Sequence, residues 1–113
     1  MNGLSIAILV STFLIGCTAQ SEYESSAREM LRDEFPQSHY GFIKSWKPIG
    51  KNYEYTLSEN ELEKSTIDVT SCIKYLSSKY PTPPKEILRS FQIVECMKTK
   101  GWYLETEEII ITR

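Results

Sequence analysis

The sequence has few of the residues that most often carry enzymatic or metal chemistry. It contains one histidine, His39, and three cysteines in 113 residues. A catalytic histidine needs a nucleophile or an orienting carboxylate, and no local pattern near His39 supplies either. Two cysteines and one distant histidine also lack the spacing of zinc ligands. We therefore expect a loop histidine exposed to solvent, no enzymatic activity, no metal site and no cofactor.

The sequence also lacks a strong excess of either charge, and it has no hydrophobic run long enough to cross a membrane. The formal net charge is −2, and no basic stripe is available to follow phosphates, so nucleic acid is not an expected partner. The apolar run of residues 4–15 is shorter than the roughly 20 helical residues that cross a bilayer. Its length is typical of the apolar region of a signal peptide, although residues 1–3 before it lack Lys and Arg.

The apolar run ends in Leu14-Ile15-Gly16-Cys17. A small residue and a cysteine after a short apolar segment resemble the lipobox of bacterial lipoproteins. The resemblance implies cleavage of residues 1–16 and acylation of Cys17, which would anchor the chain in a membrane through lipid. In that family an Asp after the cysteine can retain the protein in the inner membrane. Thr18 stands there instead, which implies the outer membrane, facing the periplasm.

Two other interpretations of this segment remain open. Cys17-Thr18-Ala19 also fits the site of ordinary signal peptidase, which would release a soluble protein beginning at Gln20. Alternatively the run is a buried core helix, although residues 6–15 lack an amphipathic pattern. We expect lipidation, with residues 17–20 as a tether and residues 21–113 as a single small periplasmic domain.

Cys72 and Cys96 remain as an even pair in an oxidising compartment, which favours a disulfide. The bond would close a loop of about 25 residues and contribute roughly 3.5 kcal/mol in the chain-entropy model. Two buried free thiols or a metal site are the alternatives.

Local signals predict three helices. Capping boxes at Ser21–Glu24 and Ser58–Glu61 open the first two helices, and Pro36 ends the first at or before Phe35. The third helix begins with Pro84 at its first position and ends before Gly101, which is expected in the left-handed conformation. Its stripe of Ile87, Phe91 and Val94 is expected to pack on the sheet.

Three strands are expected. Residues 40–46 and 53–57 read as an antiparallel hairpin around the turn at residues 47–52, and residues 103–111 read as a final strand paired with it. The predicted fold class is α+β: three helices packed on a small antiparallel sheet with one disulfide, preceded by a cleaved signal peptide.

The end of the third helix carries a second resemblance. Cys96-Met97-Lys98-Thr99-Lys100-Gly101-Trp102 is similar to a Cys-Met-x-x-Lys-Gly-aromatic ending near the C-terminus of many small, uncharacterised bacterial lipoproteins. The resemblance implies no reaction. Its role is structural: a disulfide anchor, a helix end and a buried aromatic residue.

Aromatic residues of the predicted hairpin are the best binding candidates. Exposed aromatic rings can stack on sugars or anchor a protein partner. Burial under the helices is the alternative. The candidates are Tyr40, Trp46, Tyr53 and Tyr55.

These features predict a lipid-anchored envelope protein that presents an interaction surface to an envelope partner without catalysing a reaction. The alternative is a periplasmic inhibitor or immunity protein against a hydrolase or toxin, with Pro48 to Asn52 as the inserted loop. An enzyme would need His39 in a cleft beside an acidic or hydroxyl side chain.

Overall fold

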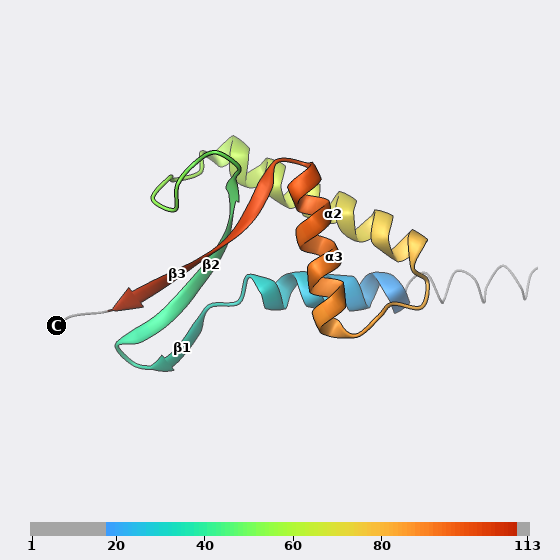
Figure 1. Cartoon of the computed structure of the whole chain (residues 1–113), viewed down its shortest axis with the longest axis horizontal. Helices are drawn as coiled ribbons and strands as arrows, with labels where there is room; N and C mark the ends of the chain where they lie inside the picture. The colour runs from blue at the N-terminus through green and yellow to red at the C-terminus, as the bar shows by residue number, and fades with distance from the viewer. Residues whose placement is uncertain (1–17, 111–113) are drawn as a thin grey trace, which may run out of the picture.

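The computed structural model describes residues 18–110, in which three helices and a three-stranded antiparallel sheet follow one another (Figure 1). Along the chain, the elements are a helix over residues 18–30, β1 (Glu34–Gln37), β2 (Tyr40–Pro48), α2 (Glu59–Lys79), α3 (Glu86–Thr99) and β3 (Trp102–Ile110). The predicted α+β class is confirmed for this part of the chain. The predicted signal peptide and Cys17 lie outside the described residues. No helix between residues 18 and 110 combines the length and apolar character that a membrane crossing requires.

The N-terminal helix begins earlier than predicted, and it ends at Met30, in agreement with the predicted end at or before Phe35. It already includes residues 18–20, so the prediction of Ser21 as its N-cap is wrong, and the expected tether is helical from Thr18 onward. The reason is the core-facing stripe, in which Ala19 and Tyr23 are fully buried. The stripe continues to Met30, after which residues 31–39 are exposed and the helix stops.

The sheet has the order β1-β2-β3. β2 and β3 pair without interruption from Tyr40 opposite Ile110 to Pro48 opposite Trp102, which confirms the predicted first and last strands over the described residues. The register of the short strand β1 on β2 is irregular. Gly41 is required at this junction, because a Cβ there would come within 2.2 Å of the Phe35 ring.

The predicted strand at residues 53–57 is wrong. These residues form a loop, and the two neighbours of β2 are β1 and β3 instead. The alternating pattern of residues 53–57 has a different cause. Leu57 packs against the core, and the Tyr55 hydroxyl donates to Glu61.

The capping box of α2 is confirmed in full. The Ser58 hydroxyl accepts from the backbone N–H of Glu61, and the Glu61 carboxylate accepts from the backbone N–H of Ser58. α2 then presents Cys72, Ile73 and Leu76 to the core.

α3 differs from its prediction at its start and on its faces. Its N-cap is Lys85, so Pro84 precedes the helix, and the Pro84 carbonyl accepts from Arg89. Two members of the expected apolar stripe, Ile87 and Phe91, are 67% and 63% exposed, whereas the third, Val94, is partly buried against the core. Ile93 and Met97 face the core instead. At the other end of α3, Gly101 has the expected left-handed conformation, with φ of 93°.

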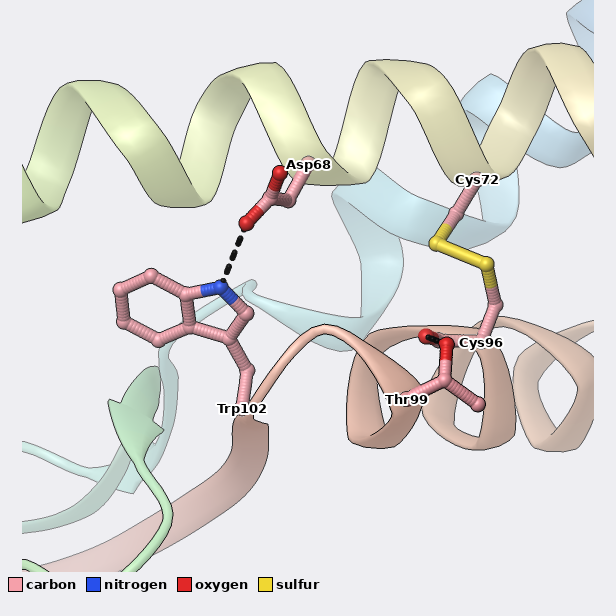
Figure 2. Close-up of a disulfide and its surroundings, with 5 residues drawn as sticks. All are labelled: Asp68, Cys72, Cys96, Thr99 and Trp102. Carbon is pink, nitrogen blue, oxygen red and sulfur yellow. Dashed lines mark hydrogen bonds between the residues drawn. A yellow bond between two sulfur atoms is a disulfide. The ribbon is translucent and has the colours of Figure 1, made fainter.

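Two contacts join α2 to the α3–β3 segment, as Figure 2 shows. The predicted Cys72–Cys96 disulfide is present, with 5.9 Å between the Cα atoms. Beside it, Trp102 Nε1 donates to Asp68 Oδ2 across 2.8 Å, and Lys64 Nζ lies 2.6 Å from the same oxygen. The start of β3 is thereby fixed against α2.

The pKa of Asp68 responds to this environment. Burial raises it, but the hydrogen bonds from Lys64 and Trp102 outweigh burial and hold the pKa below its ordinary value. A carboxyl whose folded-state pKa is lowered stabilises the fold above its unfolded pKa of about 3.9, and this contribution is lost as the pH falls through the folded-state pKa.

Two substitutions at Asp68 test this buried contact. Asp68→Ala should lower the free energy of unfolding at neutral pH by about 1–3 kcal/mol, because it leaves the indole N–H of Trp102 without its acceptor. Asp68→Asn keeps an acceptor and should cost less, but it should weaken the loss of stability between about pH 5 and pH 3. Urea unfolding followed by tryptophan fluorescence over this pH range measures both. Equal stability of the two variants at pH 7 would contradict the assignment.

Candidate functional site

The four aromatic binding candidates do not form one surface. Trp46 is only 4% exposed and belongs to the core. Tyr40 is half-buried at the opposite end of β2, edge-on to Phe42. Tyr53 and Tyr55 lie in the loop that follows β2, so the nine-residue strand, roughly 26 Å long, separates them from Tyr40.

The β2–α2 loop (residues 49–58) is an ordered segment. Lys47 Nζ donates to the Tyr55 carbonyl across 2.7 Å, and Tyr103 Oη on β3 donates to the Lys51 carbonyl across 2.8 Å. The Tyr55 hydroxyl donates to Glu61 on α2 across 2.8 Å. The loop is therefore held from β2, β3 and α2 at once.

The turn at the start of this loop depends on Gly50. Its φ of 95° lies in the left-handed region that favours glycine. The backbone N–H of Lys51 donates back to the Pro48 carbonyl across 3.2 Å. Next to this turn, Ile49 is 53% exposed and Tyr53 is 52% exposed. The ordered loop thus presents one aliphatic and one aromatic side chain to solvent.

The carboxylate of Glu61 controls the electrostatics at the base of the loop. The hydrogen bond from the Ser58 backbone, followed by that from Tyr55, lowers the pKa of Glu61. The hydrogen bond from the Tyr55 hydroxyl to Glu61 is also the main cause of the raised pKa of Tyr55. Lys51 Nζ lies 5.3 Å from the centre of the Tyr55 ring. At neutral pH the tyrosine therefore donates to an ionised carboxylate beside a cation.

His39 occupies the turn between β1 and β2 and is exposed, as expected of a loop histidine. Within residues 18–110, no group of three or more His, Cys, Asp or Glu side chains is placed to hold a metal ion.

A second surface was missed by the sequence reasoning. A groove of about 940 Å³ runs between α2 and α3, with Leu76 and Cys96 among its lining residues. Tyr75 and Tyr80 line it from the α2 side, and Leu88 and Phe91 line it from the α3 side. The sequence contained one signal of this groove. α3 has more apolar residues than a single buried helix face can accommodate.

The contact between Tyr55 and Glu61 can be tested by titration. Tyr55→Phe removes the hydroxyl donor, so the pKa of Glu61 should rise toward its ordinary value. Tyr53→Phe is the matched control, because the Tyr53 hydroxyl pairs with Glu54. Carbon-13 NMR of the Glu61 carboxyl measures the pKa. An unchanged pKa in Tyr55→Phe would contradict the loop geometry.

The chain was compared with known protein families, proteins and structures. No family model, no curated protein and no solved structure matches the chain. We therefore infer a function from the chain's own residues.

Proposed function

We propose that this chain is a lipid-anchored bacterial envelope protein that binds a protein partner through the β2–α2 loop and catalyses no reaction. The supporting observation is the start of the first helix. Thr18 is already helical, and Ala19 and Tyr23 are fully buried. An acyl group on Cys17 would therefore hold the folded body directly at the bilayer, without a flexible tether.

The proposed location is the outer membrane, facing the periplasm. The lipobox-like segment ending at Cys17 supports lipidation, and Thr18 in place of Asp supports the outer membrane by analogy with lipoproteins. The Cys72–Cys96 disulfide fits an oxidising compartment.

The β2–α2 loop suits protein recognition for two reasons. Tyrosine is enriched among the residues that dominate binding energy, and Tyr53 is half exposed beside the apolar Ile49. Loops that are already ordered lose less conformational entropy on binding. The hydrogen bonds from Lys47 and Tyr103 supply that order before a partner arrives.

One observation also favours a periplasmic inhibitor or immunity protein. Figure 1 shows the β2–α2 loop projecting past the start of α2. A projecting, ordered loop is what insertion into the active site of a hydrolase or toxin requires. On this alternative, deletion of the gene should sensitise cells to one effector. Unchanged survival against a panel of envelope hydrolases and toxins would contradict it.

Partner capture tests the main proposal. Crosslinking in living cells followed by affinity capture of the full chain should recover a specific envelope protein. Tyr53→Ala should strongly reduce that recovery, because it removes the exposed ring from the loop. Ile67→Ala is the control, since Ile67 is 59% exposed but lies on α2 outside both the loop and the α2–α3 groove. Equal recovery by both variants, or no partner above background, would contradict a role for the loop.

A further inference from the structure

The face of α3 that borders the α2–α3 groove is divided into two unlike halves. Ile87, Leu88 and Phe91 in the first half are 67%, 52% and 63% exposed. Glu95 and Lys98 follow Phe91 at the i+4 and i+7 positions of the same face, and both are exposed. The exposed apolar surface of this helix is therefore confined to its N-terminal half.

That apolar half is the part of α3 that packs on the N-terminal helix. Tyr23 Oη donates to Gln92 Oε1 across 2.5 Å, and Arg89 Nε donates to Ser26 Oγ across 2.9 Å. Thr18, where the described helix begins, precedes Tyr23 by five residues, about 7.5 Å along a helix axis. The apolar half of α3 is thus held close to the start of this helix, and Thr18 directly follows the proposed lipid anchor in the sequence.

The end of α2 extends the same region. Tyr80, at the end of α2, packs against the same core as Tyr23. Tyr80 also contributes to the raised pKa of Tyr23, second to burial. Figure 1 likewise draws the α2–α3 connection next to the start of that helix. On α2, Tyr75 is 56% exposed. Lys79 Nζ lies 5.6 Å from the ring centre of Tyr75 and 5.6 Å from that of Tyr80.

The composition of this region is typical of the membrane interface. We define the anchor-side patch as the exposed side chains of Tyr75, Ile87, Leu88 and Phe91. Tyrosine rings are enriched at the headgroup level of bilayers, where long lysine side chains can reach the phosphates. Lys79 and Lys85 at the patch are both exposed, and Glu86 and Glu95 border it.

We propose that the anchor-side patch rests on the phospholipid bilayer and forms a second membrane contact beside the acylated Cys17. This inference depends on the lipid anchor of the proposed function. Once the anchor holds the chain at the surface, the effective concentration of the patch at the bilayer is high, so a small apolar area is enough for contact.

The contact would also fix the orientation of the protein. α2 has 21 residues and spans roughly 31 Å from its start at Glu59 to its end at Lys79. The β2–α2 loop precedes the start of α2, whereas the anchor-side patch lies at its end. A membrane at the patch therefore leaves the loop at the far end of α2 from the contact, accessible to a partner.

Tryptophan quenching by brominated lipids tests the contact. The acylated full chain is extracted in detergent and reconstituted into vesicles of phosphatidylethanolamine and phosphatidylglycerol, with or without bromine on the acyl chains. Phe91→Trp places a reporter in the patch. Leu62→Trp is the matched control, because Leu62 is 55% exposed but lies near the start of α2. The emission of the buried Trp46 and Trp102, measured in the parent protein, is subtracted from both.

The proposal predicts loss of the Phe91→Trp emission in brominated vesicles and unchanged emission from Leu62→Trp. Ile87→Trp, at a second exposed position in the patch, should behave like Phe91→Trp. Vesicles that carry the protein but quench neither reporter, or quench both equally, would overturn the membrane contact and leave the lipid anchor intact. Failure of the protein to float with vesicles would overturn the anchor and, with it, this inference.

Discussion

The burial of the first helix is the constraint on which the arrangement depends. Ala19 and Tyr23 are fully buried, and the Tyr23 hydroxyl donates to Gln92 on α3. Peeling this helix from the body would expose both side chains and break that bond. Because the helix is already formed at Thr18, the residue after the proposed anchor belongs to the folded domain. Any force applied at Cys17 would therefore act on the core.

A series of contacts connects the other elements of the fold to one another. The Cys72–Cys96 disulfide joins the middle of α2 to α3, and the Trp102–Asp68 hydrogen bond fixes the start of β3 on α2. The β2–α2 loop is tied to β3 through the Tyr103 hydroxyl. A series of covalent and hydrogen-bonded contacts thus runs from the proposed membrane end to the proposed partner-binding end. The two proposed surfaces lie at opposite ends of α2, so both can be occupied together.

Local signals in the sequence were predictive where the structure depends on neighbouring residues. The Ser58–Glu61 capping box and the left-handed Gly101 are formed within a few residues of chain, and both were predicted. The disulfide followed from an even cysteine count in an oxidising compartment. The Ser21 capping box failed because the core stripe begins earlier, at Ala19, and extends the helix past the motif.

Apart from the disulfide and the pairing of β2 with β3, the features set by distant contacts were not predicted. The alternation in residues 53–57 resembled a strand, but β1 and β3 occupy both edges of β2. The stripe containing Ile87 and Phe91 identified an apolar face of α3 without showing that the first helix packs on a different side. The Trp102–Asp68 pair joins residues 34 positions apart, and no short pattern marks it. The groove between α2 and α3 is likewise formed by long-range contacts.

The measurement that tests the central claim most directly is the intact mass of the protein extracted from cell membranes. The account predicts a chain that begins at Cys17, carries a diacylglyceryl group and a further acyl chain on that residue, and retains the mass deficit of one disulfide. A chain that begins at Gln20, or one that carries no acyl group at Cys17, would contradict it. In either case the buried first helix would no longer connect the fold to a membrane.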